Sequence, residues 1–152
     1  MDTRRKAIRD VNRTKKNVKK ALVAKAKEID PAGKSAFVGV MAGSSNYGEP
    51  IAEYGAKHEF GIAGMPERSF LRVPIHEGKG QISAIAKETL QAGGTAQNAL
   101  DAMGLTGVNL SSDSFDKNNW KPNSEYTKKK KGTSKVLVDS GALRQSIDYV
   151  VR

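Results

Sequence analysis

The sequence contains no cysteine and only two histidines, His58 and His76. Without cysteine the chain has no disulfide, no thiolate ligand for a metal and no cysteine nucleophile. Two histidines leave little material for a histidine-based metal cage or a catalytic triad. These shortages argue against the commonest kinds of metal centre and of covalent catalysis.

Aromatic residues and long apolar runs are scarce as well. Aromatic side chains make up 6% of the 152 residues and hydrophobic ones 38%, which is low for a globular chain but too high for full disorder. No run approaches the roughly 18 apolar residues that a membrane span requires. The basic N-terminus is not followed by an apolar segment, so we expect no secretory signal peptide and no membrane partner.

Positive charge, in contrast, is abundant and unevenly distributed. The net charge is +10, from 26 Lys and Arg against 16 Asp and Glu. Residues 1–34 hold twelve basic and four acidic side chains, residues 35–116 hold five and nine, and residues 117–152 hold nine and three. Two basic ends therefore flank a mildly acidic middle. This asymmetry indicates a polyanion or an acidic protein surface as partner, or else a solvated basic face that binds nothing specific.

Periodicity and turn residues predict the elements of the first half of the chain. Asp30 and Pro31 stop a basic helix, and Gly61 stops a second, shorter one. The predicted elements are a helix at 4–29, a strand at 36–41, a loop at 43–46, a helix at 51–60 and an ordered loop or edge strand at 62–74.

The second half alternates helical stretches with polar segments. Gly93 and Gly94 divide two helices within 81–105, and Phe115 and Trp120 anchor a loop rich in Ser, Asp and Asn over 106–124. A short helix that ends at Ile147 and a strand at 149–151 follow. A side-chain oxygen of Asp139 or Ser140 is expected to cap the first turn of that helix.

Together these elements predict an α+β fold, with a small, mainly antiparallel sheet packed by two or three helices. We expect a basic N-terminal helix or arm over residues 1–34 and a single domain over residues 35–152.

A search for catalytic motifs finds little. His58 and Glu59 form half of a zinc-protease motif, but Ile62 stands where the second histidine is needed. Glu49, Glu53 and Glu59 are interpreted as a solvated acidic helix face. We therefore expect no enzymatic activity, no cofactor and no metal site.

The basic segments are candidates for contact with a polyanion or an acidic partner. Trp120 and Tyr126 stand near the lysine run, where aromatic rings can stack on single-stranded bases, but packing under a loop is the favoured interpretation. The candidate contacts are Arg4, Arg5, Arg9, Arg13, Lys16, Lys19, Lys20, Lys128, Lys129, Lys130 and Lys131.

Two segments resemble a known family. The stretch Ile51-Ala-Glu-Tyr-Gly-Ala-Lys-His-Glu-Phe-Gly61, followed by Met65-Pro-Glu-Arg-Ser-Phe-Leu71, is similar to the His-Glu-Phe-Gly … Ile-Pro-Ala-Arg-Pro-Phe-Leu stretch of tail-completion, or head–tail joining, proteins of tailed bacteriophages. Residues 135–147, with Asp-Ser-Gly at 139–141, resemble the C-terminal Asp-Thr-Gly motif of the same family. Ser69 replaces the usual proline, which leaves that loop less rigid, and Ser140 replaces threonine.

The resemblance implies a structural virion protein, made in the cytoplasm of the host bacterium and located at the neck of the virion. It implies a ring of six subunits that completes the tail and joins it to the head connector. Its partners are other copies of itself, the connector or stopper, and the tail terminator or tube, with non-specific contact to the DNA passing through. A basic nucleic-acid-binding protein is the alternative.

The residues that carry the resemblance serve either the internal fold or a subunit interface. Among them, Arg68 is expected to contact a carboxylate through two donors, either within the subunit or across it. The whole set is Glu59, Phe60, Gly61, Pro66, Arg68, Phe70, Leu71, Asp139, Ser140, Gly141, Leu143 and Ile147.

Overall fold

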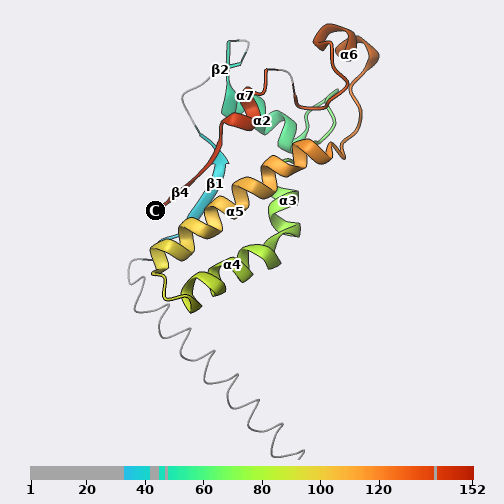
Figure 1. The fold of residues 1–152 in the computed structure, drawn as a ribbon. Helices are drawn as coiled ribbons and strands as arrows, with labels where there is room; N and C mark the ends of the chain where they lie inside the picture. The colour runs from blue at the N-terminus through green and yellow to red at the C-terminus, as the bar shows by residue number, and fades with distance from the viewer. Residues whose placement is uncertain (1–32, 42–44, 47, 139) are drawn as a thin grey trace, which may run out of the picture.

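A two-stranded antiparallel ribbon joins the two ends of the part of the chain that the structure describes. The computed structural model describes residues 33–41, 45–46, 48–138 and 140–152, so the predicted helix at 4–29 and the residue Asp139 lie outside the described residues. Strand β1 (Ala36–Val40) pairs with β4 (Ile147–Val151), with Ala36 opposite Val151 and Val40 opposite Ile147 (Figure 1). Both predicted strands are therefore confirmed.

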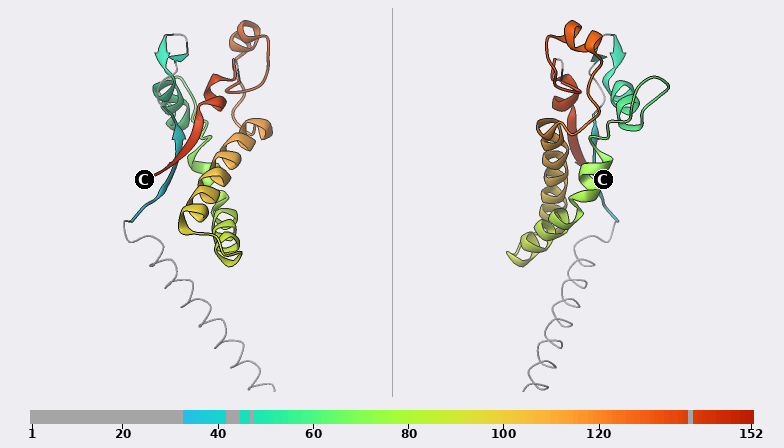
Figure 2. Two further views of the ribbon diagram at one scale, coloured as in Figure 1. Left: turned by 60° about the vertical axis from the view of Figure 1, so that its left-hand side comes forward. Right: turned by 90° about the vertical axis from the view of Figure 1, so that its right-hand side faces the viewer.

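A helical hairpin lies against this ribbon. Helices α4 (Lys79–Gln91) and α5 (Ala96–Lys117) are joined by a tight turn at Gly93, whose φ is +87°, and α5 runs along β1 and β4 (Figures 1 and 2). Thr95 begins α5 with a capping box: its hydroxyl accepts the Asn98 N–H, and the Asn98 side chain accepts the Thr95 N–H. The predicted division at the glycine pair is confirmed.

Helix α5 continues twelve residues beyond the predicted end at 105, so the loop expected over 106–124 is wrong for its first part. Beyond Ala99, the buried side of α5 consists of Gly104, Gly107, Ser111 and Phe115, at helical spacing. Three of these four residues are small or polar, so the stripe gives no hydrophobic signal. A Cβ on Gly104 would lie 2.3 Å from the Tyr149 ring, so glycine is what lets α5 approach the ribbon this closely.

Helix α2 (Ile51–Phe60) has the predicted bounds, and it ends at Gly61 with φ of +70°. The predicted loop or edge strand at 62–74 is only partly confirmed. Its first part is irregular, with one isolated bridge between Ile62 and Met65, but residues 72–77 form helix α3 (Arg72–Glu77). Pro74 does not prevent this helix, because it lies in the first turn, where backbone N–H groups have no helical partner.

Short elements complete the fold. Strand β2 (Ser45–Asn46) lies in the loop expected at 43–46 and pairs with β3 (Glu49–Pro50), so that expectation is wrong for residues 45–46. Helix α6 (Glu125–Lys131) carries the lysine run. Helix α7 (Ala142–Gln145) is the short helix expected to end at Ile147, but it ends at Gln145, and Ile147 begins β4. The α7 N-cap is Gly141 with no side-chain cap, although the Ser140 hydroxyl accepts the Ala142 N–H at 3.3 Å.

One hydrophobic core unites the two segments that carry the family resemblance. The rings of Phe70 and Phe115 lie 5.5 Å apart, and Trp120 meets Phe115 edge to face. The buried members are Ile51, Phe70, Phe115, Val136, Leu137, Leu143 and Ile147. The predicted α+β class, with a small antiparallel sheet packed by helices, is confirmed. Within the described ranges, no helix has the length and apolar character needed to cross a membrane.

Candidate functional site

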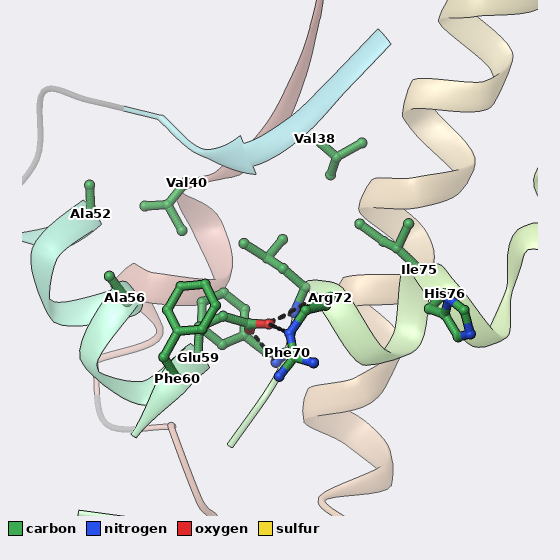
Figure 3. Close-up of a pocket in the computed structure, with 12 residues that line it drawn as sticks. Val38, Val40, Ala52, Ala56, Glu59, Phe60, Phe70, Arg72, Ile75 and His76 are labelled. Carbon is green, nitrogen blue, oxygen red and sulfur yellow. Dashed lines mark hydrogen bonds and ion pairs between the residues drawn. The ribbon is translucent and has the colours of Figure 1, made fainter. Parts of the chain in front are cut away.

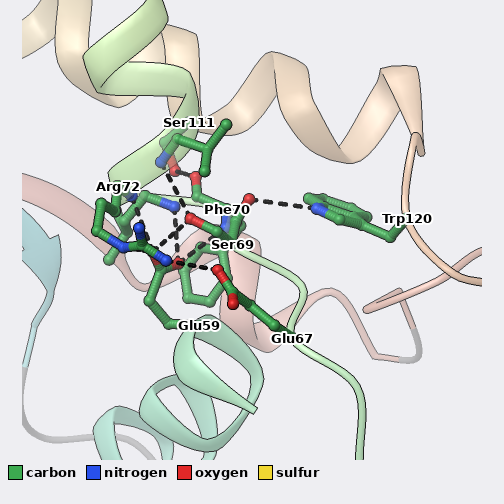
Figure 4. Close-up of polar contacts among 9 residues, drawn as sticks. Glu59, Glu67, Ser69, Phe70, Arg72, Ser111 and Trp120 are labelled. Carbon is green, nitrogen blue, oxygen red and sulfur yellow. Dashed lines mark hydrogen bonds and ion pairs between the residues drawn. The ribbon is translucent and has the colours of Figure 1, made fainter.

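Glu59 lies in the interior, so the expected solvated acidic face is wrong for this residue. Its side chain is only 4% exposed at the last turn of α2. One carboxylate oxygen accepts the backbone N–H groups of Phe70 and Leu71 at 2.8 and 3.0 Å (Figure 4). The other accepts the Arg72 N–H at 2.9 Å.

These three N–H groups belong to the start of helix α3, where they have no partner within the helix. A carboxylate is well suited to them, because a helix N-terminus carries partial positive charge. The Arg72 guanidinium lies 3.9 Å from the same carboxylate and also pairs with Glu67. Glu59 therefore fixes α3 to α2, and its oxygens are occupied by hydrogen bonds within the fold.

Ser69 completes this arrangement. Its hydroxyl donates to Glu59 at 2.5 Å and accepts the Val73 N–H at 3.0 Å, and the residue is 7% exposed. The Ser69 carbonyl accepts the Trp120 indole N–H at 3.2 Å. These hydrogen bonds hold the loop at Ser69, and its lower rigidity relative to proline stays a prediction. The interpretation as a packing anchor is confirmed for Trp120, but it is wrong for Tyr126, which is 77% exposed.

Arg68 holds a backbone carbonyl rather than the expected carboxylate. Its Nε and Nη2 atoms donate to the Lys121 carbonyl oxygen at 3.3 and 3.2 Å, within one subunit. Burial lowers the pKa of Arg68 from its ordinary value. The contact fixes the loop after α2 against the segment after α5.

An apolar groove of about 590 Å³ opens between β1, α2 and α3 (Figure 3). Val38 and Val40 line it from β1, Phe60 from α2 and Ile75 from α3. Phe60 is 67% exposed at the rim, with the Arg72 guanidinium 5.9 Å from its ring centre. The groove therefore offers an apolar surface to a partner.

A second cavity, the basic cleft, has a volume of about 650 Å³ and lies between α2, the loop at 61–68 and the segment 121–131. Arg68, Lys121, Lys130 and Lys131 line it, and no Asp or Glu does. Lys121 is not among the contacts predicted from the sequence, because a single lysine in a polar segment does not indicate which surface its side chain lines. The remaining lining comes from apolar and neutral polar groups.

His58 borders the basic cleft. It is 5% exposed, its ring meets Tyr54 edge to face at 4.7 Å, and neither ring nitrogen has a hydrogen-bond partner among the described residues. Burial lowers the pKa of His58 from 6.5 to about 4, helped by the charges of Arg68 and Lys131 and opposed by that of Glu49. The imidazole is therefore neutral at pH 7.

The structure separates the remaining predicted residues. Gly61, Phe70, Leu143 and Ile147 serve internal packing or turns, whereas Phe60 points outward. Of the other motif residues, three are half-buried (Leu71, Pro66 and Gly141), and Ser140 is exposed. In the lysine run, Lys128 pairs with Glu125, and Lys129 is exposed. The basic residues predicted at positions 4–20 lie outside the described residues.

No metal site emerges: in the ranges that the structure describes, no three His, Asp or Glu side chains are grouped so that they could hold an ion. Comparison of the chain with models of known protein families, with curated proteins and with solved structures returns no match.

Proposed function

We propose that this protein is a structural subunit of the neck of a tailed phage, forming a ring that completes the tail and joins it to the head connector. The two segments that resemble tail-completion proteins support this proposal. The proposed partners are further copies of the chain, the connector or stopper and the tail terminator or tube, with the genome passing through the ring.

The observation that carries the proposal is the exposure of Phe60. Most other apolar residues of the two motifs are buried or half-buried, but this one is 67% exposed at the rim of the apolar groove. Ile62, two residues after Phe60, and Val73 on α3 are also exposed, at 50% and 39%, although neither lines the groove. An exposed aromatic side chain at the rim of an apolar concave surface is typical of a protein interface.

A ring requires contacts between two different surfaces of neighbouring subunits. The groove supplies a concave apolar surface for one side of such a contact. Charge supports it further, since the acidic middle and the basic ends of neighbouring copies complement each other.

The first test is the oligomeric state of the purified chain, measured by mass photometry and by negative-stain electron microscopy. We expect rings for the unmodified protein and their loss in Phe60→Ser. The matched control is Tyr126→Ser, which removes an aromatic ring that is 77% exposed on α6 and away from the groove. If the two variants assembled equally well, the groove would not be part of the contact between subunits.

The second test is genetic. Particles produced without this protein should appear in micrographs as full heads beside unattached tails. Normally joined virions would contradict the neck function, whatever the oligomeric state of the purified chain.

A basic nucleic-acid-binding protein is the second candidate. Lys129 and Lys130 on α6 are exposed and, among the described residues, form no ion pair. Such a protein should bind duplex DNA with micromolar affinity that weakens steeply with salt. Deletion of residues 1–30 should abolish this binding, whereas a neck protein shortened in this way should fail to join heads to tails.

A further inference from the structure

We propose that the basic cleft is a phosphate-binding site that receives a phosphodiester group of a nucleic-acid strand. This inference does not depend on the ring, because the cleft and the apolar groove share no lining residue.

Three segments far apart in the sequence bring positive charges to this cavity. Arg68 comes from the loop after α2, Lys121 from the segment after α5, and Lys130 and Lys131 from the end of α6. With no carboxylate in the lining, these charges repel one another across the cavity. A bound anion relieves that repulsion, and one guanidinium with three lysines supplies hydrogen-bond donors for the phosphate oxygens.

His58 gives an independent indication of a missing ligand. A buried polar group without a hydrogen bond destabilises the fold, so it needs an explanation. The ring is held against Tyr54 and next to two cations of the cleft, Arg68 and Lys131, with only Glu49 acting in the opposite direction. A neutral imidazole carries one N–H donor, so a phosphate in the cleft would give the ring a hydrogen-bond partner that it lacks, and the negative charge would raise the pKa of the ring.

The dimensions favour a strand over a free phosphate ion. A volume of about 650 Å³ far exceeds a single phosphate group. Tyr126 is 77% exposed on the same short helix as Lys130, and an aromatic ring beside lysines is the usual arrangement for stacking an unpaired base.

The first experiment observes the ring signals of His58 by NMR while inorganic phosphate replaces chloride at constant ionic strength. We expect a saturable shift, and a rise in the pKa of His58 by about one unit, as an opposite charge at 4–6 Å produces. The exposed His76 on α3 is the internal control, and its signals should stay in place. Equal responses of the two histidines would overturn the site.

The second experiment measures binding of a single-stranded oligonucleotide by fluorescence anisotropy at several salt concentrations. The double variant Lys121→Gln with Lys130→Gln should make the fall of log affinity with log salt shallower. The magnitude of the slope should decrease by about 1.4, because each phosphate contact contributes roughly 0.7. Lys79→Gln with Lys87→Gln removes the same charge from α4, at the opposite end of the molecule from α6, and should change the slope less (Figure 1).

Each remaining outcome contradicts the proposal. Equal slopes in the two double variants would show that only overall charge matters. If phosphate bound but the cleft variant did not change the binding of the oligonucleotide, the ligand would be a free phosphate ion. Tighter cleft-dependent binding of a polyglutamate peptide than of the oligonucleotide would assign the cleft to an acidic protein.

Discussion

The Ser69 hydroxyl donates a hydrogen bond of 2.5 Å to the Glu59 carboxylate, and both side chains are buried. Together the two residues bind four backbone N–H groups at the start of α3, from Phe70 through Val73. One carboxylate and one hydroxyl therefore fix the position of α3 relative to α2. Because α3 lines the apolar groove, they also position one wall of that groove.

Glu59→Gln should destabilise the fold by about 2–4 kcal/mol, because an amide replaces a charged acceptor and turns a donor toward backbone donors. Guanidinium unfolding measures the free energy. Glu53→Gln on the exposed side of α2 is the matched control and should change stability by less than about 0.5 kcal/mol. Equal effects of the two substitutions would contradict the role assigned to Glu59.

Ser69→Ala should cost about 1–3 kcal/mol, since the Val73 N–H loses its acceptor and Glu59 loses a donor. Ser83→Ala, at an exposed position of α4, provides the comparison in the same unfolding experiment. A Ser69 variant as stable as the Ser83 variant would show that this hydrogen-bonded serine contributes nothing net.

Two glycine-to-alanine substitutions in helices should have opposite signs. Gly104→Ala should destabilise by about 1–3 kcal/mol, because the new methyl group would overlap the Tyr149 ring. Gly80→Ala in α4 meets open space and should stabilise by about 0.5 kcal/mol through the lower entropy of the unfolded chain. Stabilisation by both would mean that helix propensity, and not the approach of α5 to the ribbon, dominates at Gly104.

The stability of the fold should fall as the pH is lowered from 6.5 to about 4. In the unfolded chain His58 binds a proton near pH 6.5, whereas in the fold its pKa is about 4. Between these values the unfolded state binds more protons, so acid favours unfolding, by on the order of 3 kcal/mol for this residue.

Urea unfolding in chloride at several pH values tests this dependence. His58→Phe removes the titrating ring and should flatten the curve over this range, whereas His76→Gln at an exposed position should leave it unchanged. Parallel curves for His58→Phe and the unmodified protein would contradict the assignment.

Local patterns in the sequence predicted several elements correctly. The bounds of α2, the strand at β1 and the break between α4 and α5 follow from side-chain spacing and from glycine, which act over a few residues. The predicted end of α5 was wrong because Gly104, Gly107 and Ser111 are not apolar, and they become a buried face only where the ribbon and Phe70 lie against them.

The candidate site depended still more on distant contacts. Glu59 and Glu53 are the same residue type on one short helix, yet one is buried and the other exposed. Only the chain returning at 69–72 supplies the donors that make burial of Glu59 tolerable. Similarly, no spacing in the sequence connects Arg68 with Lys121.

The sequence by itself determined the positive charge, the absence of thiol chemistry and most of the local elements, because composition and short-range sterics do not depend on the rest of the fold. The tertiary structure decided which polar residues are buried, that β1 pairs with β4 from the far end of the chain, and that four cations face one cleft. These features arise when segments far apart in the sequence pack together, and the free energy of a charge or a hydrogen bond depends on those neighbours.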